Sequence, residues 1–313
     1  MIQVLEAVPN FSEGRDLEAV GALVDVIAAE DVDVLDWSAD PDHHRSVVTY
    51  IGHPRSVSAA SIAAAAFALE HFDLRRHSGL HPRIGALDVM PFVPLEGLEM
   101  QDAAAVAHEV GRAIAAMGVP VFFYGAASSP PGRALSELRR GGFEALLGGF
   151  TEGREPDLPA SSTSPHPKAG ATCVGARNIL LAWNVFVDGI THDAAKAIAA
   201  QIRERDGGFS GVRALGLYLD GQRRVQISMN LEDPERTPPI VVFEAIERAV
   251  LAQGGSMREI EVIGMMPDPL VHPAVVDRLH LPDPNPALIL SRRVAEHVQK
   301  RLGAEPLTPD DPI

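Results

Sequence analysis

Histidine and arginine are concentrated in one short stretch of the chain. An imidazole accepts and releases protons near neutral pH, because its ordinary pKa lies between about 5 and 8. A guanidinium binds a carboxylate through a fixed fork of donors. The combination indicates acid–base chemistry on an anionic substrate. The basic and titratable residues of the stretch are Arg75, Arg76, His77, His81 and Arg83.

His81 is the candidate proton-transfer residue. Pro82 favours an extended backbone at His81, and Arg83 then lies on the same side of the segment. This spacing predicts a base beside a carboxylate clamp, with His77 in a supporting place. The alternative is a surface loop of solvated charges in which a histidine caps a helix.

A second polar cluster covers residues 40–45, Asp-Pro-Asp-His-His-Arg. Adjacent side chains of an extended loop point to opposite sides, so His43 and His44 are not expected to share a metal ion, and no metal site is predicted. The functional interpretation takes Arg45 as an anion contact and His44 as a polar donor. The alternative is a turn held by hydrogen bonds of its aspartates.

Two further segments have backbones suited to a ligand. Residues 8–15 follow a predicted strand and precede a helix, and backbone donors at a helix start favour anions. Residues 165–177 contain Gly170 and Gly175, which permit close approach, and the cations Lys168 and Arg177. A cap and a linker, respectively, are the alternatives. These residues end a Pro-, Gly- and Ser-rich region, 126–172, of the length typical of binding loops or linkers.

Composition excludes several classes of partner. The 313 residues include 42 acidic and 27 basic side chains, a net charge of −15, which argues against nucleic acid and anionic membranes as partners. The single cysteine, Cys173, permits no intrachain disulfide. The N-terminus lacks the order of a secretory signal, and the longest apolar run is too short to span a bilayer. We therefore expect a cytoplasmic protein.

Hydrophobic periodicity predicts the same order of elements twice. Strands and helices alternate as β-α-β-β-α-β up to about residue 92 and again between 179 and 265. That order is typical of the split β-α-β arrangement. The expected fold is therefore α+β, with two ferredoxin-like subdomains and additional helices. The additional helices are expected at 102–117 and 134–147, and one or two covering helices and a frayed, Pro-rich end are expected after Pro267. The second repeat itself includes a helix at 192–205.

Taken together, these segments resemble the formiminotransferase domain of the glutamate formiminotransferases, which vertebrates fuse to a cyclodeaminase. The resemblance runs to about residue 266 and is most specific in His-Pro-Arg-Ile-Gly-Ala-Leu-Asp-Val at 81–89. It is supported by the segments 8–14, Arg45 with its following strand, 124–125, 170–172, 175–177, 218–220 and 230–231.

The resemblance implies a homodimer whose N-terminal subdomain covers residues 1–177 and whose C-terminal subdomain covers 178–313. It implies transfer of the formimino group from N-formimino-L-glutamate to tetrahydrofolate, a co-substrate, with no prosthetic group and no metal. His81 matches the catalytic histidine. Substrate- and folate-binding candidates are Asn10, Arg45, Arg83 and a loop formed by Ser161, Ser162, Thr163, Ser164, Pro165, His166, Pro167, Lys168, Ala169 and Gly170.

The chemistry of that transfer suggests further candidates. A cation forms at the transferred carbon, and Asp36 or Asp40 could stabilise it; His44 and Arg177 are the remaining candidates. The chain has His44 and Ser38 where the vertebrate enzymes have Asn and Asp, and residues 167–169 lack an aromatic. Competing functions are formyl transfer between folate and glutamate, hydrolysis of formiminoglutamate by His81-activated water, and folate binding without catalysis.

Overall fold

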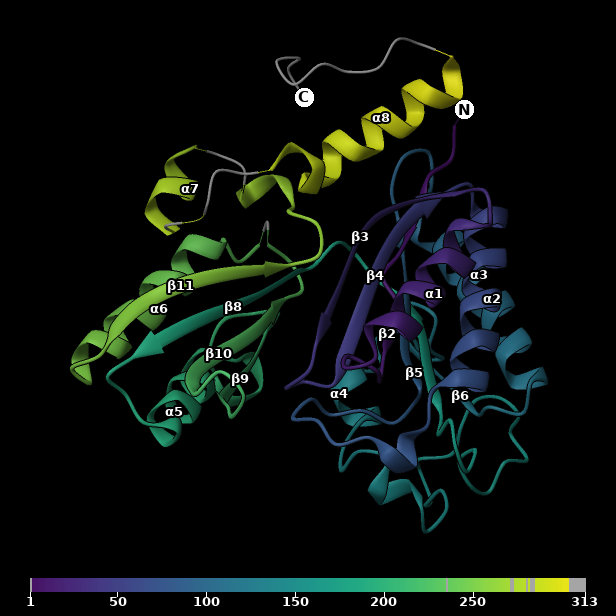
Figure 1. Ribbon diagram of the computed structural model, residues 1–313, viewed down its shortest axis with the longest axis horizontal. Coiled ribbons are helices and arrows are strands. Elements are labelled where there is room, and N and C mark those ends of the chain that lie inside the picture. Colours follow the sequence, from purple (N-terminus) through teal and green to yellow (C-terminus); the bar gives the residue numbers. More distant parts are fainter. Residues whose placement is uncertain (1, 235, 271–272, 280, 282–284, 304–313) are drawn as a thin grey trace. The chain divides into compact units, whose positions relative to one another are not determined.

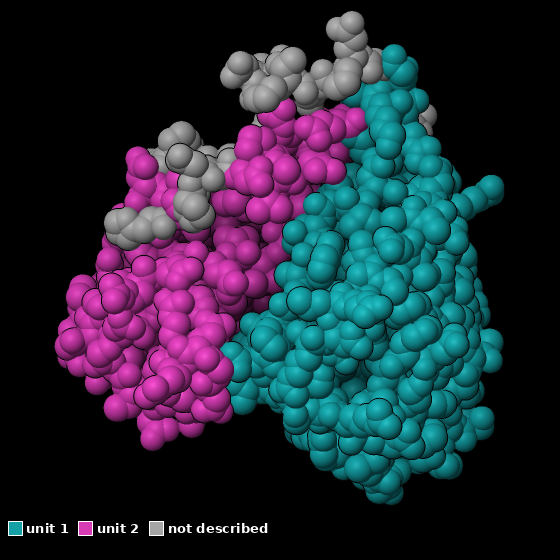
Figure 2. All heavy atoms as spheres, viewed as in Figure 1, with its two compact units in different colours: residues 1–177, 297–304 teal, residues 178–296, 305–313 magenta. Residues whose placement is uncertain are grey.

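The computed structural model describes residues 2–303, apart from 235, 271–272, 280 and 282–284. The Pro-rich end of the chain expected to fray, from 304 onward, therefore lies outside the described residues. The chain separates into two compact units, which are coloured differently in Figure 2. Unit 1 contains residues 1–177 and 297–304, and unit 2 contains residues 178–296. Each unit is described by itself.

The sheet of unit 1 begins as a split β-α-β arrangement. Strands β1 and β2 form one interrupted strand that lies between β4 and β5 and is antiparallel to both, while β3 pairs with the outer side of β4. Pro9 separates β1 from β2, since proline cannot donate to a sheet ladder. Beyond β5 the sheet continues through β7 to β6 in parallel pairing. The bounds are β1 Leu5–Ala7, β2 Asn10–Phe11, β3 Val32–Asp40, β4 Arg45–Gly52, β5 Leu87–Pro94, β6 Val121–Gly125 and β7 Thr172–Ala176.

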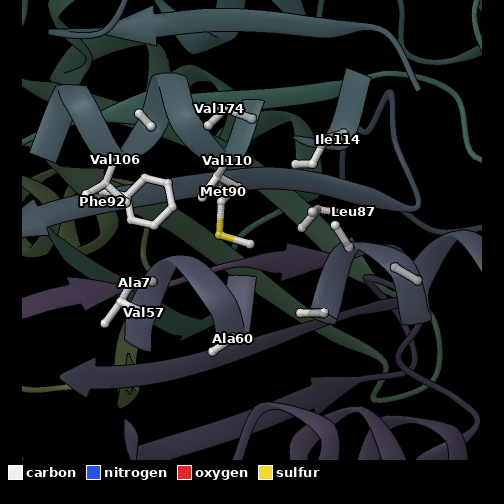
Figure 3. Close-up of a cluster of buried hydrophobic side chains, with 14 of the residues drawn as sticks. Ala7, Val57, Ala60, Leu87, Met90, Phe92, Val106, Val110, Ile114 and Val174 are labelled. Atoms are coloured by element: carbon white, nitrogen blue, oxygen red, sulfur yellow. The ribbon is translucent and has the colours of Figure 1, made fainter. Parts of the chain in front are cut away.

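Helices α1 (Leu17–Ala28), α2 (Pro54–His71) and α3 (Met100–Ala116) pack on this sheet. Figure 3 shows Met90 and Phe92 of β5 between Val57 of α2 and Val106 of α3. These side chains are almost fully buried. Each large apolar side chain contributes about 1.5–3 kcal/mol when buried. The core therefore fixes the helices to the strands of this sheet, and Figure 1 shows α1, α2 and α3 alongside these strands.

A second apolar cluster lies on the opposite face of β6 and β7. Side chains alternate along β6, so that Phe122 and Tyr124 point away from the main core. They pack with α4 (Leu135–Leu138) and the 3-10 helix η2 (Glu144–Leu146). The predicted continuous helix over 134–147 is wrong.

Glycines interrupt that predicted helix. Gly141 has a φ of 76° and Gly142 a φ of 65°. This left-handed conformation ends a right-handed helix. The prediction also missed strand β7, whose small residues were assigned to the end of the long loop.

Unit 2 repeats the split β-α-β order. Its sheet has the order β11-β8-β10-β9 with antiparallel pairing throughout. The α+β fold is therefore confirmed, and this order of strands is consistent with the expected ferredoxin-like subdomain. The helix predicted over 192–205 ends at Ile202 and is followed by a 3-10 turn, η3 (Glu204–Asp206). The remaining bounds are β8 Leu181–Asp188, α5 His192–Ile202, β9 Val212–Leu219, β10 Arg224–Leu231, α6 Pro239–Ala252, β11 Ser256–Ile263 and α7 Pro273–Leu279. Helix α8 (Leu290–Leu302) begins in unit 2, and its residues from His297 onward belong to unit 1.

Candidate active site

Four residues of unit 1 form what we call the His81 cluster: Arg45, His81, Asp88 and Arg139. Arg45 is the first residue of β4, and Asp88 is the second residue of β5. His81 lies in the loop between the 3-10 helix η1 (Leu74–Arg76) and β5, and Arg139 follows α4. The ends of two rigid strands therefore carry two of the four groups.

The His81 ring lies between two guanidinium groups. Arg45 Nη1 is 2.5 Å from His81 Nε2, and Arg139 Nη2 is 3.0 Å from His81 Nδ1. Since a guanidinium only donates, Nε2 accepts from Arg45. A neutral ring has one accepting nitrogen, so Nδ1 carries the hydrogen, and the approach of Arg139 Nη2 to Nδ1 is a contact between two donors and not a hydrogen bond. This Nδ1–H donates to the carbonyl of Pro82 at 2.8 Å, and the basic lone pair of His81 is on Nε2.

Asp88 holds both the loop after His81 and Arg139. The carboxylate is 2% exposed. Its Oδ1 accepts the backbone N–H groups of Ile84 at 2.7 Å and Gly85 at 3.3 Å, and its Oδ2 lies 2.6 Å from Arg139 Nη2. Arg139 also donates to the carbonyl of Pro82. One buried carboxylate thus positions the turn and the cation beside the histidine.

The surroundings of His81 disfavour its protonated form. Burial lowers the pKa of His81 well below its ordinary value, and Arg45, Arg139 and His43 lower this pKa further. Burial and the charge of Arg139 also lower the pKa of Arg45, to about 9, so Arg45 remains charged at neutral pH. His81 is therefore a neutral imidazole facing cations.

A second group of residues, the His77 cluster, lies beside the first and consists of Glu13, His44, His77 and Ser78. The rings of His44 and His77 stack with centroids 4.3 Å apart. His44 Nδ1 accepts from the backbone N–H of Ser78 at 3.2 Å. The other nitrogen of this neutral ring therefore carries the hydrogen. Its Nε2–H donates to Glu13 Oε1 at 3.2 Å, and His77 Nε2 donates to the carbonyl of His44 at 2.7 Å.

Both histidines of the His77 cluster are held neutral. Burial is the main cause that lowers the pKa of His44, and it also lowers the pKa of His77, to about 4. His44 has φ +51°, a left-handed conformation that directs its ring to His77, while the ring of His43 lies 6.1 Å from that of His81. The two adjacent histidines thus serve different clusters.

Arg83 pairs with Glu144, a partner that its spacing in the sequence does not predict. Its guanidinium forms a bidentate pair with Glu144, with distances of 2.8 and 2.6 Å, and this pair lowers the pKa of Glu144 to about 2. Arg83 thus makes a well-formed ion pair with the segment that follows α4. Its role toward a substrate stays a prediction.

The other polar candidates occupy β2 and β3. Asn10 is buried on β2 and donates to the carbonyl of Val8 at 2.7 Å. Asp40 accepts the backbone N–H of His43 at 2.7 Å, so it shapes the loop that carries His43. Asp36 lies on β3, where burial raises its pKa.

The end of the predicted folate loop, residues 169–170, pairs with residues 84–86, which follow His81 in the chain. Gly85 pairs with Gly170, and the N–H of Ala86 donates to the carbonyl of Ala169 at 2.9 Å. Gly170 has φ +72°, and a Cβ there would lie 2.0 Å from the carbonyl oxygen of Ile84. This contact requires glycine.

The remaining loop residues and Arg177 have different surroundings. His166 Nδ1 accepts the backbone N–H of Ala169 at 3.0 Å, while Ser161, Thr163 and Ser164 are exposed. Arg177 donates its backbone N–H to the carbonyl of Phe92 at 3.0 Å. Burial raises the pKa of Glu6 to about 7, and the charge of Arg177 opposes that rise.

Sequence reasoning missed three residues near His81: His43, Asp88 and Arg139. Asp88 lies in the stretch 81–89, in which the resemblance to the family is most specific, and this position could have identified Asp88 as a site residue. Arg139 lies in an irregular region, and its position depends on pairing with Asp88, which is distant in the chain.

Metal ligation and membrane insertion find no support in the described part of the chain. Within it, no three His, Cys, Asp or Glu side chains are grouped as metal ligands would be. Nor does any helix there combine the length and apolar character of a bilayer span.

Comparisons with known proteins agree over both units. Residues 4–177 match the N-terminal subdomain of the formiminotransferase domain, and residues 182–309 match the formiminotransferase domain. A glutamate formimidoyltransferase of Thermoplasma acidophilum is 37% identical over 85% of this chain and 89% of the relative, and one of Streptococcus pyogenes is 35% identical over 85% and 90%. A formimidoyltransferase-cyclodeaminase of Sus scrofa is 35% identical over 100% of this chain and 59% of the relative.

Proposed function

This chain belongs to the formiminotransferase family, and from that premise we propose that it is a transferase that moves the formimino group of N-formimino-L-glutamate to tetrahydrofolate. The products are 5-formiminotetrahydrofolate and L-glutamate, which places the enzyme in histidine breakdown and one-carbon metabolism. Tetrahydrofolate is a co-substrate in this reaction.

One observation carries the proposal: a neutral imidazole with its basic lone pair on Nε2 lies between two guanidinium groups. The arginines suit the carboxylates of the glutamyl donor. The imidazole suits a reaction in which one nitrogen must lose a proton and another must gain one. Both requirements are those of formimino transfer.

The proposed reaction balances through His81. N5 of tetrahydrofolate attacks the formimino carbon and forms a C–N bond. His81 Nε2 takes the proton from N5 once Arg45 Nη1, which donates to Nε2 in the structure, has turned to the carboxylate of the donor. The same proton then passes to the glutamate nitrogen, the old C–N bond breaks, and L-glutamate leaves. Such acid–base catalysis contributes about 10²–10⁴-fold, and holding two substrates together contributes about 7–11 kcal/mol.

We place the folate at residues 161–170 and the glutamyl donor at Arg45, with Asn10 and Arg83 as further contacts. The attachment of Ala169 and Gly170 to residues 84–86 supports this, since it brings the end of the loop to the His81 turn. The division into subdomains at residue 177 is supported by the extents of the two family matches. A cytoplasmic homodimer completes the proposal, and light scattering tests the dimer.

Incubation of the purified protein with formiminoglutamate and tetrahydrofolate tests the function. We expect the formimino adduct of the folate to accumulate, with equal release of glutamate, as measured by absorbance and mass. Parallel reactions omit the folate or replace the donor with formylglutamate. Glutamate release without folate would identify a hydrolase, and a formyl adduct alone would identify a formyltransferase; either result would refute the proposal.

A further inference from the structure

We propose that Arg45 and Arg139 form a carboxylate clamp around the His81 ring, so that an anionic donor must bind before His81 can hold a proton. This inference rests on the proposed function for the identity of the donor. It adds Arg139 as a substrate-binding residue and Asp88 as the residue that positions it.

The charges of the cluster are not balanced. Two guanidinium groups face one imidazole, and the carboxylate of Asp88 pairs with one of them, that of Arg139. Asp88 also accepts two backbone N–H groups, so part of its capacity is already used. The cluster therefore carries a net positive charge beside a neutral base, which suits a substrate anion.

Unused donors in the cluster point to the same conclusion. Among the residues that the structure describes, the Nε atoms of Arg45 and Arg139 are buried and have no hydrogen-bond partner. Buried polar groups are normally paired, since a buried donor without a partner loses the hydrogen bond that it makes with water in the unfolded chain. A bound carboxylate has acceptor sites for several such donors at once.

The chemistry of the donor selects which carboxylate binds here. In N-formimino-L-glutamate the departing nitrogen and the α-carboxylate are attached to the same carbon. A clamp that holds the α-carboxylate between the two arginines therefore brings the departing nitrogen to the His81 ring. The γ-carboxylate is farther along the chain of the donor, which leaves it for other contacts.

An anion in the clamp also makes protonation of the His81 ring more favourable. The charged and titratable groups that face its ring are Arg45 from β4, Arg139 after α4 and His43 from the loop between β3 and β4, while Asp88 acts through Arg139. Without an anion, the two cations oppose a third positive charge on the ring. A carboxylate between them offsets this repulsion, so the ring accepts the proton of N5 once the donor is in place.

Titration of His81 by NMR tests the clamp. The protein is labelled with ¹³C in its histidine rings, and the His81 signal is assigned by its absence from His81→Asn. We expect a low pKa in the wild type and a rise of at least about one pH unit with saturating L-glutamate. By linkage, glutamate then binds at least about tenfold more tightly when His81 is protonated.

Three variants separate charge from structure. Arg139→Gln should raise the His81 pKa of the free protein and weaken the response to glutamate. Arg139→Lys keeps the charge but lacks the fork, so it should keep the low pKa and lose part of the glutamate response. Arg75→Gln removes an exposed arginine that pairs with Asp73, and it should change neither value.

The inference falls if glutamate leaves the His81 pKa of the wild type unchanged, or if Arg139→Lys and Arg139→Gln both respond to glutamate as the wild type does. These readouts need no turnover. A glutamate-dependent rise in a protein that transfers no formimino group would refute the proposed function and leave the clamp standing. Transfer without any rise would refute the clamp alone.

Discussion

The two histidine clusters of unit 1 place their imidazole rings in different surroundings. His81 faces guanidinium groups at both ring nitrogens, and neighbouring donors among the described residues are unpaired. His44 and His77 stack on each other and bond to backbone groups and Glu13. Protonation of His81 is therefore coupled to an outside anion, whereas protonation of the stacked pair is coupled to the fold.

The contrast shows why the number of histidines in a loop is a poor guide to function. Both clusters have histidines whose pKa is lowered, mainly by burial. They differ in which groups face the rings. Cations beside the His81 ring leave a positive charge that a substrate anion can offset. In the second cluster, three of the four ring nitrogens already have partners in the backbone or Glu13, and His77 Nδ1 is buried without a hydrogen-bond partner among the described residues. We expect activity to depend on the first cluster and stability on the second.

The largest expected difference between the clusters concerns turnover. His81→Asn should lower kcat by about 10²–10⁴-fold, because asparagine keeps polarity but transfers no proton. His77→Asn should change kcat much less and lower the melting temperature instead. Initial rates of folate adduct formation and thermal melts of both variants measure this. Equal losses of kcat in the two variants would remove the distinction.

The next effect concerns how the two clusters are joined. Gly79 lies between His77 and His81, and a Cβ there would be 2.2 Å from the carbonyl oxygen of His43 and 2.7 Å from Cβ of His44. Gly79→Ala should therefore displace the loop and destabilise the protein by about 1–3 kcal/mol, with a loss of activity. Urea unfolding and initial rates give the two values.

Gly148→Ala is the matched control for that change. Gly148 is exposed, and a Cβ there has no atom within 4 Å in the described structure. Its stability and activity should match those of the wild type. A Gly79→Ala protein as stable and active as this control would mean that the loop is free to move and that the two clusters are not rigidly joined.

The sequence was informative where the signal is local. The periodicity of α1, α2, α5 and α6 and the apolar strands predicted both β-α-β-β-α-β repeats. His81 was found because its residue type and the motif around it lie within nine residues. Strand β7 was missed because it has five residues, includes Gly175 and directly follows a Pro-rich loop. The helix predicted over 134–147 was wrong because Gly141 and Gly142 adopt a left-handed conformation within it.

The partners of His81 could not be read from spacing. Arg83 is two residues away but pairs with Glu144, and Arg139 is 58 residues away but contacts the ring. Which arginine faces the ring depends on where Asp88 and the segment after α4 meet in the folded chain. Such pairings are tertiary, so a prediction from one sequence identifies the kind of chemistry and leaves the partners open.

The smallest expected effect is the contribution of His77 to the pH dependence of stability, to which His81 contributes as well. The pKa of His77 falls from its ordinary value of 6.5 to about 4 in the folded protein, so the unfolded chain binds the proton more tightly. The stabilisation of the neutral ring is then fully present above the unfolded pKa and is lost as the pH falls toward 4. One proton gives a slope of at most about 1.4 kcal/mol per pH unit, and partial exposure reduces it.

Urea midpoints between pH 7.5 and 4.5 measure this slope. The wild type should lose stability over that range more steeply than His77→Asn, which has no ring to protonate. His81→Asn is the second comparison, because the pH dependence of its stability lacks the contribution of His81. In the wild type, saturating glutamate should raise the folded pKa of His81 and so reduce the contribution of His81 to the slope. Glutamate should leave the contribution of His77 unchanged. If glutamate flattened both contributions, the stacked histidines would also respond to the anion, and the two clusters would act as one.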